Sequence, residues 1–158
     1  MTMITLQISD SILAADGSTP MDGALLERAT QAALDFARAP ADADLSLVLT
    51  DDDQLRALNM QFLGIDAPTD VLSFPAGEVN PETELPYLGD VIISYPRARL
   101  QAVEGGYPVE DELQLLAVHG VLHLLGRDHA EETEKVVMWA EQSAILAQLG
   151  CSITSPRE

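Results

Sequence analysis

All three histidines of the chain lie within eleven residues, from His119 to His129. His119 and His123 are four positions apart, so on a helix their imidazoles lie on one face about one turn apart, close enough to share a divalent ion. Gly126 allows the chain to reverse after the helix, which would bring His129 back as a third ligand. Three neutral imidazoles with an open fourth position are typical of a catalytic zinc site rather than a closed structural one.

The competing interpretation is that these histidines are ordinary core residues bonded to the backbone. A lone histidine on an apolar helix usually is, but three at this spacing, with none elsewhere, favour a shared metal ion. Two roles stay open for Asp128, which could orient a ligand imidazole or simply face water. Cys151, the single cysteine, is not excluded as a further ligand, whereas Arg127 is interpreted as facing solvent or paired with an acidic residue.

The spacing matches the long zincin pattern H-E-x-x-H-x-x-G-x-x-H at every position except one. Gly120 stands where the glutamate would act as general base, so peptide hydrolysis lacks its proton acceptor unless a carboxylate comes from elsewhere in the fold. Metal-assisted hydrolysis of another electrophile remains. A phosphodiester is one such electrophile, and in RNA the 2′-hydroxyl is an alternative nucleophile.

Hydrophobic periodicity predicts the elements that position these residues. Strands are expected over residues 4–8, 45–49, 70–74 and 88–94, and helices from Asp22 to before Pro40, from the acidic residues 51–53 through Phe62, and over about 96–104, 109–125 and 131–149. The order β-α-β-α-β-β-α-α-α predicts an α/β fold, with a small mixed sheet of about four strands and packed helices, in a single domain over residues 1–158.

Three local features add to this prediction. Pro75 is expected to end the third strand, and residues 76–86 are expected to form an exposed loop, either a flap over a site or a mobile connection. The acidic run Asp51–Asp53 could cap a helix or hold a cation, and capping is the favoured interpretation.

The composition limits the classes of function. The 158 residues include 26 acidic and 8 basic ones, giving a formal net charge of −18. Such a chain repels phosphate backbones at long range, which excludes a broad nucleic-acid or anionic-membrane binder but permits a narrow, locally compensated site. The single cysteine, the absence of a secretion signal and the lack of any long apolar stretch predict a cytoplasmic protein that does not span a membrane.

The segment His119-Gly-Val-Leu-His-Leu-Leu-Gly-Arg-Asp-His129 resembles the H-G-x-L-H-L-x-G-x-D-H signature of the YbeY family, bacterial endoribonucleases that mature ribosomal RNA. Two further blocks support it, Leu58-Asn59 followed by Pro68-Thr-Asp-Val-Leu-Ser-Phe-Pro75, and Leu88-Gly-Asp-Val-Ile-Ile-Ser94. With Glu112-Leu113 before the signature and Met138 after it, the similarity covers about residues 45–149. The resemblance implies that the domain is metallohydrolase-like, with one zinc ion on His119, His123 and His129. It also implies single-strand-specific RNA cleavage, maturation of the 16S rRNA 3′ end, ribosome quality control, and rRNA precursors and ribosomal proteins as partners.

One position departs from the family pattern. Where the family commonly has an arginine thought to contact phosphate, this chain has Leu63. Either another cation takes that role, with Arg56, Arg97, Arg99 and Arg127 as candidates, or the nuclease activity is weakened.

Two other functions therefore stay open beside a zinc-dependent endoribonuclease. One is a ribosome-assembly factor in which the zinc is mainly structural, and the other is a zinc hydrolase of a different substrate. The sequence makes no prediction of the oligomeric state.

Overall fold

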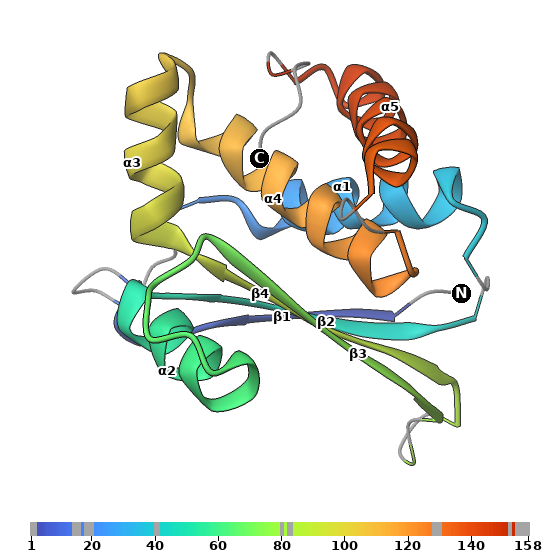
Figure 1. The fold of residues 1–158 in the computed structure, drawn as a ribbon, viewed down its shortest axis with the longest axis horizontal. Helices are drawn as coiled ribbons and strands as arrows, with labels where there is room; N and C mark the ends of the chain where they lie inside the picture. The colour runs from blue at the N-terminus through green and yellow to red at the C-terminus, as the bar shows by residue number, and fades with distance from the viewer. Residues whose placement is uncertain are drawn as a thin grey trace.

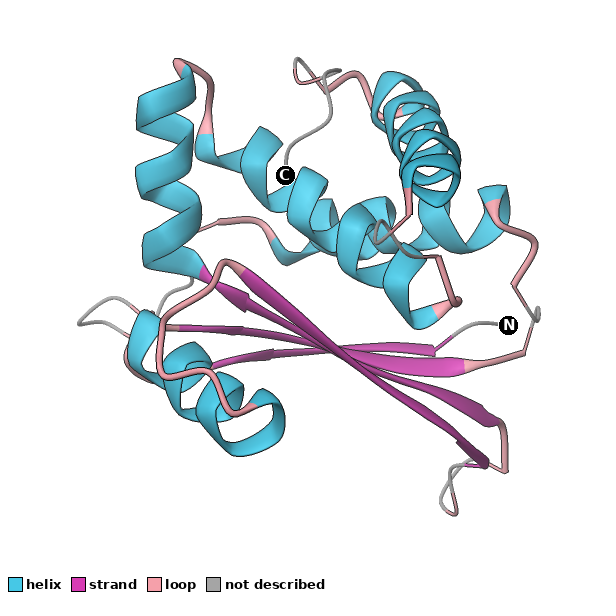
Figure 2. Cartoon of the chain, viewed as in Figure 1, coloured by secondary structure: helices cyan, strands magenta, loops and turns pink. Residues whose placement is uncertain are grey.

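The computed structural model describes residues 3–13, 17, 21–39, 42–79, 81, 84–127, 131–151 and 153. Over these residues the elements follow the predicted order (Figure 2). They are β1 (Met3–Ile8), α1 (Gly23–Phe36), β2 (Asp44–Thr50), α2 (Asp52–Leu63), β3 (Val71–Val79), β4 (Pro86–Ser94), α3 (Tyr95–Gly105), α4 (Val109–Leu124) and α5 (Glu132–Gln148).

The strands of the described residues form one mixed sheet of four, in the order β1-β2-β4-β3 (Figure 1). β1, β2 and β4 are parallel, and β3 runs antiparallel to β4. The predicted α/β fold with a small mixed sheet is confirmed. β3 therefore lies at an edge of the sheet, beside β4 alone.

Helices cover both faces of this sheet unequally (Figure 1). α1, α4 and α5 lie on one face, over a large aliphatic core, and α2 lies on the other, over a small cluster of Leu55, Leu72 and Ile92. α4 is buried nearly all round, as expected for the most apolar helix, because it packs against α1, α3, α5 and two strands. None of the described helices is both long and apolar enough to cross a membrane.

The acidic run before α2 acts as a helix cap, as predicted. The Asp51 side chain accepts a hydrogen bond from the Gln54 N–H at 2.9 Å, and Asp52 and Asp53 occupy the first turn. Their charges lie at the positive end of the helix dipole, which they stabilise. Asp52 also accepts hydrogen bonds from Ser94 Oγ at 2.7 Å and from Arg97 Nη2 at 2.9 Å, and so ties α2 to the start of α3.

The hairpin between β3 and β4 corrects two predictions. Pro75 does not end the third strand, which continues to Val79, and β4 already begins at Pro86. The expected exposed loop over residues 76–86 is therefore wrong at both of its ends, which are strand.

Proline is tolerated within β3 because of where its nitrogen points. The Ser94 N–H donates to the Asp70 carbonyl at 2.9 Å, so Asp70 and every second residue after it bond to β4. The backbone groups of Pro75 face away from β4, where a missing N–H costs no ladder hydrogen bond. The sequence rule that proline ends a strand does not hold at such an edge position.

α4 lies directly against the sheet at Gly120. Ser73 Oγ donates a hydrogen bond to the Gly120 carbonyl at 2.8 Å. A Cβ at position 120 would lie 2.5 Å from Val91 Cγ1 and 3.2 Å from Ser73 Oγ, which is inside van der Waals contact. A side chain here requires the helix or the Val91 side chain to shift, so the position that holds glutamate in the zincin pattern has no room for one in this fold.

We expect Gly120→Ala to lower the free energy of unfolding by about 1 kcal/mol. Overpacking a buried contact costs about 1–3 kcal/mol, and the better helix propensity of alanine offsets about 1 kcal/mol of it. Chemical denaturation measures the change. The control is Val91→Ala alone and combined with Gly120→Ala, because removing the contacted methyl should make the double variant more stable than the two single losses predict. Additive losses would show that the contact is not the cause.

Candidate metal centre and its pocket

His119 and His123 lie one turn apart on α4, with ring centroids 4.7 Å apart and ring planes at 71°. Both side chains line the same pocket, which has a volume of about 480 Å³. The structure thus brings the two imidazoles together on one helix face, in the arrangement that the spacing predicts. Their role as metal ligands remains a prediction.

Gln142 on α5 holds the first of these imidazoles. Its Oε1 lies 2.9 Å from His119 Nδ1, and the glutamine side chain is buried, only 1% exposed. Because an amide oxygen can only accept, Nδ1 carries the ring proton, and Nε2 keeps the lone pair that a metal requires. The chemistry of this donor set fits zinc. Sequence reasoning missed Gln142; its only signal is a polar residue among the apolar positions of the last helix.

The third expected ligand, His129, and its neighbour Asp128 lie outside the described residues. Gly126 has a φ of +91°, in the left-handed region, so the chain does turn after α4 as predicted. Within the described ranges no group of three His, Cys, Asp or Glu residues is close enough to hold a metal ion. The described residues therefore include two of the three predicted ligands, His119 and His123.

Cys151 lies apart from the two histidines. Its buried thiol donates to the Asp111 carbonyl at 3.6 Å, near the start of α4, and it does not line the pocket. Burial raises the pKa of the Cys151 thiol to about 11, which disfavours the thiolate that metals bind. The geometry gives no support to this cysteine as a further ligand.

The pocket lies between α4, Gln142 in the interior of α5, and the edge strand β3. From the strand side it is lined by Thr69, Asp70, Val71, Leu72, Ser73 and Pro75. Its described lining contains no arginine or lysine, and Leu63, which is 58% exposed, lies on its rim. Leu63, the position at which the sequence resemblance leads us to expect an arginine, thus lines the pocket with an aliphatic side chain.

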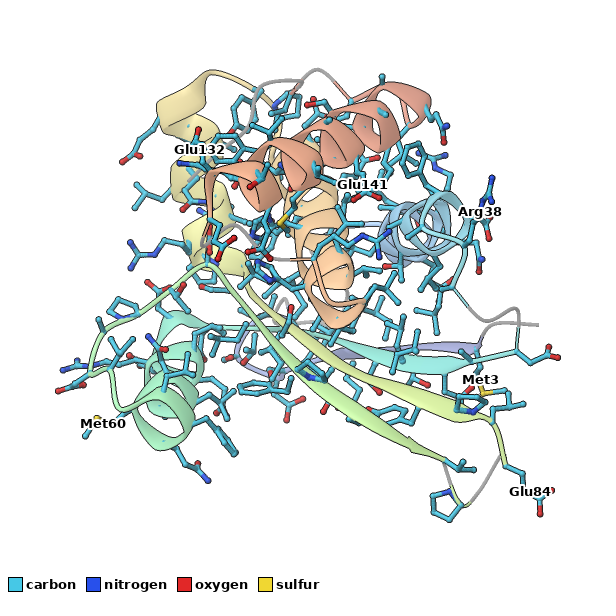
Figure 3. The ribbon with its side chains drawn as sticks, turned by 45° about the vertical axis from the view of Figure 1, so that its right-hand side comes forward. Met3, Arg38, Met60, Glu84, Glu132 and Glu141 are labelled. Carbon is cyan, nitrogen blue, oxygen red and sulfur yellow. The ribbon has the colours of Figure 1, made fainter. Side chains whose placement is uncertain are left out.

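The four arginines proposed as substitutes all lie outside this lining and have other partners. Arg56 pairs with Asp66 at 2.7 Å, Arg97 with Asp52 at 2.9 Å and Arg127 with Glu141 at 3.1 Å; Arg99 lies over the Tyr95 ring at 5.8 Å. Glu141 projects from α5 (Figure 3), and the pairing of Arg127 with an acid confirms that prediction. In this structure none of the four cations faces the histidines.

The side-chain amide of Gln101 hydrogen-bonds to two carboxyl groups, those of Glu112 and Asp70, and Asp70 lines the pocket. Gln101 Nε2 donates to Glu112 Oε2 at 2.6 Å and to Asp70 Oδ2 at 3.3 Å, and the Tyr107 hydroxyl donates to the other oxygen of Glu112. Glu112 is fully buried. Burial raises the pKa of the Glu112 carboxyl to about 7; the Gln101 hydrogen bond opposes this, and the charge of Asp70 adds to it.

Known proteins share this sequence and fold. The family model described as Endoribonuclease YbeY matches residues 15–150. A curated protein named Endoribonuclease YbeY from Desulfitobacterium hafniense is 44% identical over 132 residues, 80% of this chain and 84% of that protein. One of the same name from Chloroflexus aggregans is 43% identical over 141 residues, 85% and 92% of the two chains. The solution structure of TM1509 from Thermotoga maritima is similar with a TM-score of 0.59 at 26% identity, covering 94% of this chain and 89% of that one.

We expect Gln142→Leu to weaken zinc binding by about 10- to 100-fold, because His119 loses the acceptor that fixes its ring. Competition with a chromophoric chelator measures the affinity. Gln142→Glu is the matched control, since a carboxylate oxygen still accepts from Nδ1 and should keep tight binding. Wild-type affinity in Gln142→Leu would contradict the positioning role.

We expect Glu112→Gln to change how stability depends on pH. The folded-state pKa of Glu112 is raised above its unfolded value of 4.5, so its contribution is fully present below pH 4.5 and is lost as the pH rises to about 7. The variant should therefore gain stability relative to wild type between pH 5 and pH 8, by roughly 1–2 kcal/mol after allowance for solvent screening.

Urea denaturation at pH 5, 6.5 and 8 measures this difference. Glu110→Gln is the control, because Glu110 lies on the same helix but is exposed. A difference between Glu112→Gln and wild type that stays constant over this range would show that the buried carboxyl does not take up a proton there.

Proposed function

Because the chain belongs to the Endoribonuclease YbeY family, we propose that it is a zinc-dependent, single-strand-specific endoribonuclease that acts in ribosomal RNA maturation. Family membership makes it a hydrolase of phosphodiester bonds. The observation that carries the rest of the proposal is the pair of imidazoles, His119 and His123, facing an open pocket of about 480 Å³.

The zinc ion would be held by His119, His123 and His129. Bound there, it would lower the pKa of water towards ~7 and polarise the phosphate. The chain's own residues support this role in two ways. Gln142 fixes the ring proton of His119 on Nδ1, and Asp70 supplies the carboxylate of the described pocket lining, a group able to accept a proton from the attacking oxygen.

The pocket favours catalysis over a mainly structural zinc. Structural zinc sites are closed by four protein ligands, whereas catalytic ones keep a position open to solvent. Here two histidines lie beside a space large enough for part of a substrate, and the described lining adds no thiol. The absence of the zincin glutamate, for which Gly120 leaves no room, disfavours peptide hydrolysis.

The substrate we propose is a ribosomal RNA precursor, cut at the 3′ end of 16S rRNA, with a further role in ribosome quality control in the cytoplasm. The net charge of −18 supports entry of RNA through the pocket alone rather than along a broad basic surface. The same acidic exterior suits docking on basic ribosomal proteins, an association that salt should weaken.

We expect His123→Ala to abolish both zinc binding and RNA cleavage, because one imidazole of the pair is lost. The measurements are metal content of the purified protein and cutting of a single-stranded rRNA precursor on a gel. Arg28→Ala, an exposed change on α1, is the control and should keep both. Equal cleavage by wild type and His123→Ala would reveal a contaminating nuclease and remove support for the function.

A further inference from the structure

The outer edge of β3 runs along the pocket that holds the two histidines. β3 is the last strand of the sheet, and among the described residues no other strand pairs with its outer edge. Val71, Leu72, Ser73 and Pro75 of this strand all line the pocket, together with His119 and His123. A row of backbone groups thus borders the candidate metal centre.

The hydrogen-bond pattern fixes which groups point outward. Asp70 is bonded to Ser94 of β4 at 2.9 Å, and in an antiparallel pair bonded and non-bonded positions alternate. Leu72 therefore bonds to β4, whereas the N–H and C=O groups of Val71 and Ser73 point away from it. Pro75 follows the same alternation, since a residue without an N–H stands at an outward position.

These two N–H groups have no acceptor within the described part of the chain. No loop or side-chain hydrogen bond uses them, and the Ser73 side chain bonds instead to the Gly120 carbonyl. Two donors about two residues apart, or roughly 6.7 Å, thus lie on the outer edge of a strand whose residues line the pocket. Unpaired donors of this kind on an edge strand are ready to bind an extended ligand.

The ligand that best fits this edge is the sugar-phosphate backbone of RNA. The pocket lies in a chain of net charge −18, and its described lining has no arginine or lysine, so phosphate oxygens that do not reach the metal ion must find neutral donors there. Backbone N–H groups are such donors. The outward carbonyls between them can accept from 2′-hydroxyls, which only RNA provides.

We propose that the outward N–H groups of Val71 and Ser73 bind phosphate oxygens of the single-stranded RNA next to the bond that is cut. This inference rests on the proposed endoribonuclease function and names the part of the chain that holds its substrate. The edge strand takes the place of the cation that is missing at Leu63. An extended peptide could also pair with such an edge, and the test below separates the two ligands.

Amide hydrogen exchange of the wild-type protein tests the proposal directly. The spectra of the protein as purified, with its metal, are recorded with and without a single-stranded RNA of twelve nucleotides whose linkages are phosphorothioates, which resist cleavage. We expect RNA to slow exchange and shift the resonances at Val71 and Ser73, and to leave Leu72, already bonded to β4, unchanged. Bound RNA without an effect at Val71 and Ser73 would overturn the inference.

The same exchange measurement is repeated with an extended peptide of twelve residues in place of the RNA. Protection of the two amides by the peptide and not by RNA would also overturn the inference, in favour of a peptide-binding edge. Failure here is distinct from failure of the proposed function, because wild-type cleavage and its loss in His123→Ala are measured separately. If the wild type cleaves RNA but RNA does not protect the Val71 and Ser73 amides, only the proposed RNA binding by the β3 edge is refuted.

Proline substitutions supply an independent measurement of affinity. Val71→Pro and Ser73→Pro each remove one outward N–H, and Val71→Ala and Ser73→Ala control for the lost side chains. Fluorescence anisotropy of a labelled RNA should show binding about tenfold weaker in each proline variant than in its alanine control. Equal affinities in proteins with intact circular dichroism spectra would overturn the inference, and if neither proline variant folds, the exchange experiment decides alone.

Discussion

The direct contact between α4 and the sheet at Gly120 is the constraint on which the site depends. With no Cβ at this position, the helix approaches β3 and β4 closely enough for Ser73 to hydrogen-bond to the helix backbone. Gly120 lies between His119 and His123, so the same contact fixes the height of both imidazoles above the edge of the sheet. A larger residue would move the helix, and with it the two side chains that could hold a metal.

Charge shapes the site as strongly as packing does. A chain with 26 acidic and 8 basic residues has few cations for binding phosphate, and three of its four candidate arginines form ion pairs that tie helices and loops together. The described pocket is left with imidazoles, a carboxylate, hydroxyls and backbone groups. Phosphate recognition in such a pocket has to come from hydrogen-bond geometry and from any bound metal, since long-range attraction opposes it.

Much of the fold could be predicted because its signals are local. Alternating or helical spacing of apolar residues reveals each element, and the acidic cap of α2 needs only its own four residues. The prediction that β3 ends at Pro75 was wrong because the effect of this proline depends on a partner strand ten or more residues away. The histidine pair could be predicted from the sequence for the same reason as the helices, since residues four positions apart lie about one helical turn apart.

The remaining parts of the site come from contacts between distant segments. Gln142 reaches His119 across 23 positions, and Ser73 reaches Gly120 across 47. The network of Gln101, Glu112 and Asp70 joins α3, α4 and the start of β3. Periodicity in one sequence does not encode such pairs, and only the packing of the helices on the sheet brings them together.

In β3 the side chain and the backbone groups of one residue point toward different parts of the molecule. The Ser73 hydroxyl donates a hydrogen bond to the Gly120 carbonyl of α4, whereas its backbone N–H lies on the outer edge of the strand that lines the pocket. Contacts made by main-chain atoms do not depend on which side chain is present. A conventional alanine scan of this strand would therefore report on packing against α4 and overlook ligand contacts along the edge, and related chains could vary these positions without losing such contacts.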